Sequence, residues 1–382
     1  MPSASGKPDV IIIGGGIVGC AAAYYLSRAG ASVVLYEKDS VASHASGFAF
    51  GGILTAGGAG EGHPLDGLAR TADKCHTSFE AALATESGID PEYVHRAAVF
   101  VAMTDAEAES SRRTYGQHLR DRKFDQDVRW LAHGELSHLE ARIGPEVRGG
   151  LYYGAALEVE PYKLTLGLWQ AAEKRGARLV NRQVTGLLRS GSRVTGVQAG
   201  DHRESAGAVV IASGPWASEA GNWLGLHIPV FPLKGQILRL KAALPAMETS
   251  FWWGGNYCST KSDGLVWVGT TEERAGFDES ISTQARDAIT SAAVRAFPYL
   301  RDAELVKQTA CLRPITSDRL PVLGTVPGVD GAVIATGTGR NGIELGPAMG
   351  LAAAELALGR KPNFDISRLA LDRLLLPPGP SM

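Results

Sequence analysis

Cysteine is scarce in this sequence, and the patterns in which it usually builds a site are missing. The 382 residues contain four cysteines, namely Cys20, Cys75, Cys258 and Cys311. No two of them have C-x-x-C spacing, so the sequence indicates neither a zinc site nor a redox dithiol. Four cysteines in a chain of this length do not make a disulfide framework, and they favour a reducing cytoplasm.

The sequence also lacks an excess of charge and a long apolar run. The formal net charge is −2, and no basic tract is longer than two residues. This argues against nucleic acid or an anionic membrane surface as the main partner. No apolar run approaches the ~20 residues that span a bilayer, and the first ten residues lack the apolar core of a signal peptide. We therefore expect a soluble, cytoplasmic protein with no membrane span, whose oligomeric state stays open.

What the chain does have is length and glycine. A chain of 382 residues is too long for one compact core, so two domains are expected. Hydrophobic residues make up 45% and charged residues 20%, as in an ordinary globular protein. The 47 glycines amount to about 12% of the chain, against a usual ~7%. Their placement is therefore informative.

The most ordered pattern is a strand, a glycine turn, a helix and a second strand near the start of the chain. The stretch VIIIGGGIVGCAAAYYLSRAGASVVLYEK occupies residues 10–38. Residues 10–13 are β-branched, as a buried parallel strand requires, and residues 21–28 are rich in helix formers. Gly30 is a suitable helix stop, and residues 32–36 form a second apolar strand.

Each glycine of the turn has a mechanical role in binding a dinucleotide. Gly14 allows the tight turn, Gly16 lets the backbone approach a pyrophosphate, and Gly19 lets the helix pack against the strand. The helix N-terminus offers unpaired N–H groups to the phosphates, and Glu37 can accept hydrogen bonds from a ribose. The acidic residue at position 37 disfavours a 2′-phosphate and hence NADP. The alternative is a plain βαβ unit with a glycine turn.

Four later stretches carry a resemblance to a known family. They are VVIASGPWAS (209–218), FPLKGQ (231–236), CLRPITSDRLPVLG (311–324) and GTGRNGIELGPAMG (337–350). Together they resemble the D-amino acid oxidase family of flavoproteins, in the branch that holds glycine oxidase, sarcosine oxidase and D-amino acid dehydrogenase. The glycine turn alone is shared with many flavoproteins, whereas these stretches are more specific. The resemblance implies FAD rather than NAD as the cofactor.

The resemblance also implies an architecture. The expected fold is α/β, with a Rossmann-like FAD-binding domain and a discontinuous second α+β substrate domain built on a mainly antiparallel sheet. The FAD-binding domain would combine residues 1–84, 146–222 and 306–382. The substrate-binding domain would combine residues 85–145 and 223–305.

The implied activity is FAD-dependent oxidation of a small amino acid, either a D-amino acid, glycine or an N-alkyl amino acid. A hydride would pass from the α-carbon to flavin N5, and the resulting imine would hydrolyse to an oxo acid and an amine. Oxygen or another electron acceptor would reoxidise the flavin. Two alternatives stay open: a 2-hydroxy acid dehydrogenase, and a flavin-bearing subunit of a larger complex.

Arginine is the residue suited to the constant part of an amino acid, its α-carboxylate, because it is always charged and donates two parallel hydrogen bonds. Arg313 stands in a Leu-Arg-Pro triplet over residues 312–314, in which Pro314 fixes the backbone beside it. In the family that the chain resembles, the arginine of this triplet holds the substrate carboxylate. Arg340 is either a second anion contact or a structural residue. Tyr257 is a candidate for substrate binding, as is Trp252, although both can instead form an aromatic core.

The resemblance further implies the cofactor contacts. The residues that we expect to contact FAD are Gly14, Gly16, Ile17, Val18, Gly19, Glu37, Lys38, Ser46, Gly51, Gly52, Val184, Ala212, Gly214, Gly339, Asn341, Gly342 and Ile343.

Three residues near these motifs have competing interpretations. Cys311 is expected to be a small buried residue beside a non-covalently bound FAD. In monomeric sarcosine oxidase a cysteine in a comparable position is linked to the flavin 8-methyl carbon, so a covalent link is the alternative, and a free catalytic thiol is a third. His44 is either close to the flavin or structural. Asp318 is expected to cap a turn before Arg319.

Overall fold

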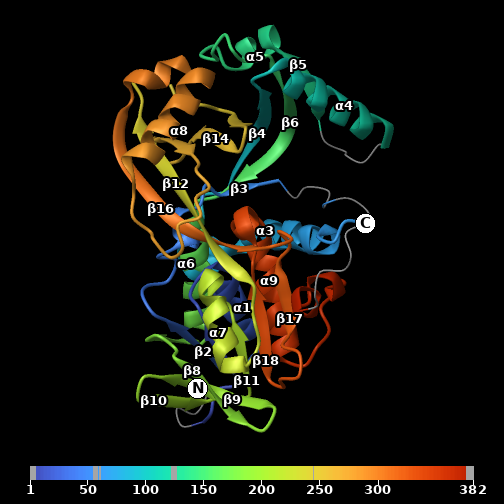
Figure 1. Cartoon of the computed structure of the whole chain (residues 1–382), viewed down its shortest axis with the longest axis vertical. Helices are drawn as coiled ribbons and strands as arrows, with labels where there is room; N and C mark the ends of the chain where they lie inside the picture. Colours follow the sequence, from blue (N-terminus) through green and yellow to red (C-terminus); the bar gives the residue numbers. More distant parts are fainter. Residues whose placement is uncertain (1–5, 55–58, 60–61, 122–126, 244, 376–382) are drawn as a thin grey trace.

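The computed structural model describes residues 6–54, 59, 62–121, 127–243 and 245–375 of the elongated chain (Figure 1). A large sheet with its helices occupies the upper part of Figure 1, and a smaller sheet with its helices occupies the lower part. Among the described residues, no helix combines the length and the apolar character needed to cross a bilayer.

The lower part is built on a six-stranded sheet. Five strands run parallel, and β17 pairs antiparallel with β18 at one edge. The strands lie in the order β17 (Val322–Thr325), β18 (Ala332–Thr336), β11 (Ala208–Ile211), β1 (Val10–Ile13), β2 (Val33–Glu37) and β7 (Arg178–Asn181). All residues of β1 and β2 are buried, because helices or strands cover both faces.

Alternate side chains of β1 enter two different cores. Val10 and Ile12 pack with four helices, α1 (Ile17–Arg28), α3 (Asp66–Ser87), α6 (Pro161–Lys174) and α9 (Gly342–Ala357). Ile11 and Ile13 pack on the opposite face. That face is covered by α7 (Ala217–Leu224) and by a three-stranded antiparallel sheet of β8 (Gly186–Ser190), β9 (Arg193–Ala199) and β10 (His202–Ser205).

The upper part is a nine-stranded, mainly antiparallel sheet, in which only the described pairing of β13 with β4 is parallel. Its order is β16 (Glu304–Thr316), β12 (Val230–Lys241), β15 (Val266–Gly269), β14 (Asn256–Thr260), β13 (Ser250–Trp253), β4 (Val94–Ala102), β6 (Gly149–Glu158) and β3 (Gly52–Ile53), with β5 (Val128–Ala132) paired to β6. The helix α8 (Thr283–Ala296) packs on it, and α4 (Asp105–Asp121) and α5 (His133–Leu139) lie at its far end.

The expected fold class is confirmed. The predicted strand over residues 10–13 is β1, and the helix α1 begins at Ile17 and includes the helix formers of residues 21–28. Gly16 is the last extended residue before it, with φ −80° and ψ −178°. Gly19 therefore lies inside the first helical turn.

The predicted domain limits stay a prediction, and strands β3, β6 and β16, which fall largely in the segments assigned to the FAD-binding domain, belong to the large sheet. Strand β6 falls in the segment assigned to the FAD-binding domain, yet it pairs with β4 of the large sheet. Strand β16 does the same with β12. The pattern of a strand in the sequence does not reveal which strand it will pair with, so the limits at 145 and 305 could not anticipate this.

Candidate active site

A long cleft lies where the parallel strands of the smaller sheet end. The carboxyl ends of β1, β2, β11 and β18 contribute Ile13, Glu37, Ala212 and Thr336 to its lining. The opposite wall comes from the large sheet, including residues 311–314 of β16. The space between the walls is about 1810 Å³, open mouth included. Open α/β sheets bind ligands at this end of their strands.

The glycine turn is shaped by close contacts that side chains would obstruct. Gly14 has φ +110°, and a Cβ there would lie 2.5 Å from the Ala212 carbonyl oxygen. A Cβ at Gly19 would lie 1.9 Å from the Gly14 carbonyl oxygen. Gly19 is the one predicted cofactor residue outside the described cleft lining, and its closeness to Gly14 matches its predicted packing role.

The start of α1 faces the cleft with little to compensate its positive end. Its first turn holds no acidic residue. The Ile17 N–H donates to Ser46 Oγ at 2.9 Å, and Ser46 is itself in the cleft lining. A Cβ on Gly16 would lie 3.1 Å from the same oxygen, so this glycine borders open space and not packed backbone. These features suit a phosphate group.

The Glu37 carboxylate lies beside the turn. Its Oε2 accepts from the Gly15 N–H at 2.7 Å, and its Oε1 accepts from the Asp39 N–H at 2.9 Å. A carboxylate has further acceptor capacity on each oxygen, so ribose hydroxyls can still bind there. Lys38 Nζ lies 3.7 Å from the centre of the Trp216 ring, which also lines the cleft.

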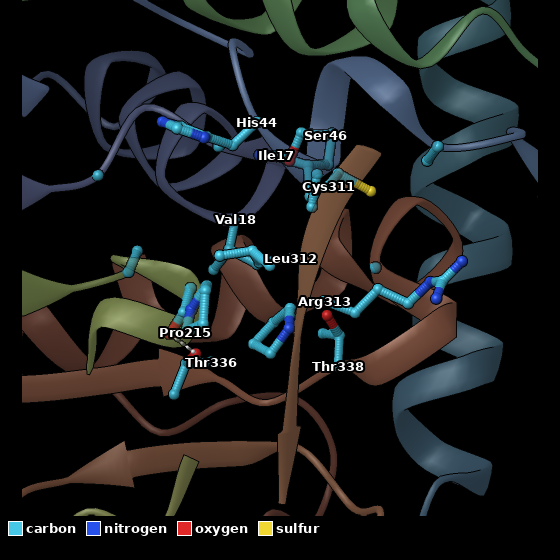
Figure 2. A pocket seen from close by; sticks show the side chains of 18 of the residues that line it. Ile17, Val18, His44, Ser46, Pro215, Cys311, Leu312, Arg313, Thr336 and Thr338 are labelled. Carbon is cyan, nitrogen blue, oxygen red and sulfur yellow. Dashed lines mark hydrogen bonds between the residues drawn. The ribbon is translucent and has the colours of Figure 1, made fainter. Parts of the chain in front are cut away.

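The remaining predicted cofactor residues also lie along the cleft. Figure 2 shows several side chains of its lining converging from α1, β16 and the ends of β11 and β18. The helix α9 starts at the cleft, preceded by a 3-10 turn over Gly339–Asn341. The predicted residues found in the lining are Gly14, Gly16, Ile17, Val18, Glu37, Lys38, Ser46, Gly51, Gly52, Val184, Ala212, Gly214, Gly339, Asn341, Gly342 and Ile343.

These residues fit an FAD molecule. The cradle at Gly16 would be filled by a side chain, a helix N-terminus points at it, and an acidic residue adjoins it. When bound, FAD would supply a redox-active flavin ring at the cleft. The protein would hold it through the glycine turn and the first turns of α1 and α9.

Arg313 is a buried cation at the same cleft, with 9% of its surface exposed. Its Nη2 donates to Thr270 Oγ1 at 2.7 Å, and its Nη1 donates to the Thr271 carbonyl oxygen at 3.1 Å. Among the described residues, no carboxylate forms an ion pair with it. A buried charge without a counter-ion is costly, so this guanidinium is prepared for an anionic ligand.

The residues that hold Arg313 are ones that sequence reasoning missed. Thr270 Oγ1 also donates to the Gln236 carbonyl oxygen at 3.0 Å, and Thr271 Oγ1 accepts from the Gln236 N–H at 3.0 Å. Gly235 lies under the guanidinium, since a Cβ there would be 2.1 Å from Arg313 Nη1. Gly235 and Gln236 lie in the stretch FPLKGQ, which carried part of the family resemblance but indicated no contact with Arg313. No motif marks Thr270 and Thr271, because these residues reach Arg313 only through the pairing of β12 with β15 and β16.

We predict that Gly235→Ala will weaken substrate binding without loss of the fold. The added methyl meets only the end of a flexible side chain, so the guanidinium must move while the strand stays. A shift of about 1 Å at a positioning group can cost on the order of 100-fold in rate. We expect kcat/KM to fall about 10- to 100-fold, with FAD content unchanged.

The matched control is Gly186→Ala, since the atom nearest to its added methyl is 3.9 Å away. In an Arg313→Ala background the Gly235 change should have little further effect. If Gly235→Ala retains normal kcat/KM, Arg313 is not the carboxylate ligand or tolerates displacement.

Tyr257 and Trp252 form an aromatic wall with Phe50, and all three line the cleft. The ring centres of Phe50 and Tyr257 are 4.2 Å apart, and those of Trp252 and Tyr257 are 5.4 Å apart. Burial raises the pKa of the Tyr257 phenol to about 12, although the nearby Arg313 lowers it. Tyr257 is therefore a neutral hydrogen-bond donor at pH 7.

Arg340 and His44 also line the cleft, but both are engaged with protein groups. Arg340 Nη1 lies 3.2 Å from Glu272 Oε1, and its Nη2 donates to the Gly255 carbonyl oxygen at 2.6 Å. The two ring nitrogens of His44 lie 2.7 Å and 3.0 Å from carboxylate oxygens of Asp39 and Glu279. These contacts favour a structural part for His44, whereas Arg340 keeps free N–H groups.

Comparison with known proteins decides between the families that use such a glycine turn. The family model described as "FAD dependent oxidoreductase" (DAO) matches residues 9–356. The chain belongs to this family. It is an FAD-dependent oxidoreductase, and the expected cofactor is confirmed.

A glycine oxidase sequence, a glycine oxidase crystal structure and a hydrogen cyanide synthase subunit illustrate the similarity, which extends over most of this chain. Glycine oxidase of Geobacillus kaustophilus is 31% identical over 96% of this chain and 97% of its own. The crystal structure of glycine oxidase from that organism superposes with a TM-score of 0.89 at 30% identity, covering 95% of this chain and 98% of that one. Hydrogen cyanide synthase subunit HcnC of Pseudomonas aeruginosa is 28% identical, covering 88% of each chain.

In the present chain, Cys311 is buried in the lining of the cleft. Burial raises the pKa of its thiol, although Arg313 nearby lowers it. The thiolate that a covalent link or a catalytic thiol requires is therefore disfavoured.

We predict that acid precipitation will release all flavin to the supernatant, as measured by absorbance. Colour that stays in the pellet, and disappears in Cys311→Ala, would contradict this.

Asp318 lies outside the described cleft lining. Its Oδ1 accepts from the Leu320 N–H at 3.1 Å, and its Oδ2 accepts from Arg373 Nε at 2.8 Å. Asp318 caps a turn, as expected, but this turn contains Arg319 instead of preceding it, and the contact with Arg373 ties it to the C-terminal region.

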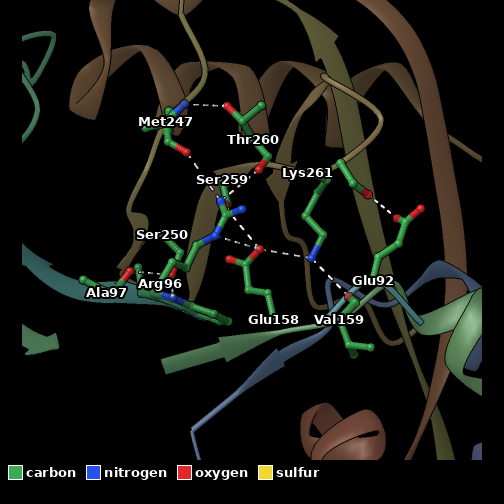
Figure 3. Close-up of polar contacts among 12 residues, drawn as sticks. Glu92, Arg96, Ala97, Glu158, Val159, Met247, Ser250, Ser259, Thr260 and Lys261 are labelled. Atoms are coloured by element: carbon green, nitrogen blue, oxygen red, sulfur yellow. Dashed lines mark hydrogen bonds and ion pairs between the residues drawn. The ribbon is translucent and has the colours of Figure 1, made fainter. Parts of the chain in front are cut away.

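A buried ionic cluster supports the wall that carries Phe50 (Figure 3). The side chains of Glu158 and Lys261 are 3% and 5% exposed, and Lys261 Nζ lies 3.1 Å from Glu158 Oε2. Lys261 Nζ also donates to the Val159 carbonyl oxygen and lies 4.9 Å from the Phe50 ring centre. Because Val159 N–H donates to the Gly51 carbonyl oxygen, the cluster anchors the segment that precedes β3.

Proposed function

We propose that the protein oxidises the C–N bond of a small α-amino acid, namely glycine, a D-amino acid or an N-alkyl amino acid. The observation that carries the proposal is Arg313, a buried cation at the cleft with no acidic partner among the described residues. An α-carboxylate is the anion that matches its planar, two-pronged donors. The glycine oxidases among its relatives support an amino acid over other carboxylates.

The chain's own groups would bind and orient the substrate and exclude water. Arg313 holds the carboxylate, and the neutral Tyr257 phenol offers a further donor. The rings of Phe50, Trp252 and Tyr257 contact one another and fill the wall of the cleft, so a substrate with a short side chain is favoured. These contacts would orient the substrate α-carbon toward the bound cofactor, which would supply the electron acceptor, and the oxidised substrate would hydrolyse in water.

The test is a substrate panel on the purified protein. Glycine, sarcosine and both enantiomers of alanine and of lactate would be supplied first without an electron acceptor, to follow the flavin absorbance, and then with oxygen or an artificial electron acceptor, to follow the products. We expect bleaching of the flavin absorbance and release of ammonia or methylamine with one or more of the amino acids. Bleaching by lactate alone would replace the proposal with a 2-hydroxy acid dehydrogenase.

A subunit function is the second candidate, because one relative is named a subunit of hydrogen cyanide synthase. It predicts an FAD-containing single chain that no member of the panel bleaches. Turnover by the purified single chain would contradict it.

A further inference from the structure

One acidic side chain in the cleft has no place in the mechanism above. Glu344 is the third residue of α9, and it lines the cleft next to Gly342 and Ile343. Its Oε1 accepts from the Leu54 N–H at 3.0 Å, which ties α9 to the chain just after β3. A carboxylate there would bring negative charge into a cleft that must also accept the phosphates and flavin of FAD.

From this placement we propose that Glu344 takes up a proton when FAD enters the cleft and stays neutral beside the bound cofactor. The inference rests on the FAD assignment and is independent of the substrate. It gives the protein a proton-linked cofactor site, in which affinity for FAD depends on pH.

The positive end of α9 and the Leu54 N–H are the groups that favour a carboxylate at Glu344, and no described side chain supplies a cation to it. Burial raises the pKa of its carboxyl to about 7, and the Leu54 N–H only partly opposes this effect. FAD would remove the remaining water of the cleft and add negative charge. Both changes disfavour the ionised form, so the pKa in the complex must be higher still.

The elements packed against α9 supply no cation to Glu344 among the described residues. From α3, His76 Nε2 donates to the Glu344 carbonyl oxygen at 3.0 Å, and its Nδ1 contacts the Tyr93 hydroxyl. Burial lowers the pKa of His76 to about 4 and raises that of Tyr93, so both are neutral at pH 7.

The other described elements that pack against α9 also supply no cation to Glu344. From α1, Cys20 is buried with a raised pKa and contacts the Gly15 carbonyl oxygen. Arg340 precedes the helix and is engaged with Glu272. The strands β3, β11, β17 and β18 carry no titratable side chain.

The direction of the pH effect follows from these pKa values. Below pH 7 the carboxyl already carries its proton in the free protein, so FAD binds with full affinity. Above pH 7 each binding event must first protonate the group. The dissociation constant of FAD then rises about tenfold per pH unit until the pKa of the complex is reached.

The experiment measures FAD binding to the apoprotein between pH 5.5 and 9, by fluorescence of free FAD. The variant is Glu344→Gln, which keeps an acceptor for the Leu54 N–H but carries no charge. We expect the wild-type dissociation constant to rise at least tenfold between pH 7 and pH 9, and that of the variant to change much less. The matched control is Glu355→Gln, in the last turn of the same helix, because its pKa is also raised by burial but it lies outside the described cleft lining. It should behave as the wild type.

Direct proton uptake gives a second readout, which is measured on both the wild type and the variant. In weakly buffered solution with a pH indicator, FAD should take up more than ~0.5 proton at pH 7.5 and almost none at pH 5.5. Equal proton uptake in wild type and Glu344→Gln, or FAD affinity in the wild type that does not change with pH, would overturn the proposal. If the proposal about Glu344 fails in this way but the protein still turns over an amino acid, the proposed function stands. If the protein binds no FAD at any pH, both the proposal about Glu344 and the proposed function are wrong.

Discussion

Arg313→Ala should lower kcat/KM on the best substrate by about 30- to several-thousand-fold. Removing one partner of a desolvated charge pair costs roughly 2–5 kcal/mol, which corresponds to that range at ~1.4 kcal/mol per decade. FAD content should be unchanged, because the described contacts of Arg313 go to Thr270 and Thr271 and leave its other N–H groups for a ligand. Arg313→Lys should recover only part of the loss, since an ammonium lacks the two-pronged geometry.

Two measurements make this prediction specific to the carboxylate. A competitive carboxylate inhibitor should lose affinity in parallel with the substrate, whereas an amine without a carboxylate should be much less affected. Arg340→Ala is the matched control, because that arginine is partly exposed and paired with Glu272. If Arg313→Ala keeps a near-normal kcat/KM and Arg340→Ala does not, the carboxylate is held by Arg340.

Gly16→Leu should abolish FAD retention while the protein still folds. The nearest atom to a Cβ at Gly16 is the side-chain oxygen of Ser46 at 3.1 Å, so the leucine would extend into the cleft and not into packed backbone. It would occupy the space into which a pyrophosphate must come close. The measurement is the flavin-to-protein absorbance ratio after gel filtration, together with thermal unfolding of the colourless protein.

Two other glycines separate this effect from a general disturbance. Gly134→Leu should retain FAD, because nothing lies within 4 Å of its added Cβ and the residue lies in α5, far from the cleft. Gly19→Leu should lose the fold itself, because its Cβ would meet the Gly14 carbonyl oxygen at 1.9 Å. A yellow Gly16→Leu protein with a full complement of FAD would place the pyrophosphate elsewhere.

The first strand, the glycine turn and the first helix were predictable from residue types alone. A β-branched run, glycines at fixed spacing and a run of helix formers act over a few residues, so their geometry needs little help from distant parts of the chain. The family resemblance of four later stretches then indicated FAD, and the match over residues 9–356 confirms it. The residues expected to contact the cofactor lie along the cleft, apart from Gly19, and their contacts with FAD stay a prediction.

What surrounds Arg313 was decided only by the tertiary structure. The Leu-Arg-Pro triplet over residues 312–314 predicted a carboxylate ligand, but the residues that hold Arg313 come from other strands or their ends. The stretch FPLKGQ, which contains Gly235, indicated the family and not this contact, and no local pattern marks Thr270. The register of β12 on β16 brings Gly235 to the same side as Arg313, and the pairing of two strands far apart in sequence is not encoded in either one alone.

The same holds for charge and burial. The sequence shows Arg340 and Glu344 as two charged residues in one loop, yet the structure pairs the first with Glu272 and leaves the second with only the Leu54 N–H as a described side-chain partner. A charged side chain has its ordinary pKa in an extended chain, and only the packing of α9 against α1, α3 and β3 removes enough of the water around Glu344 to raise the pKa of its carboxyl. Burial is a property of the whole fold, so the proton affinity of this residue could not be inferred from its neighbours in the sequence.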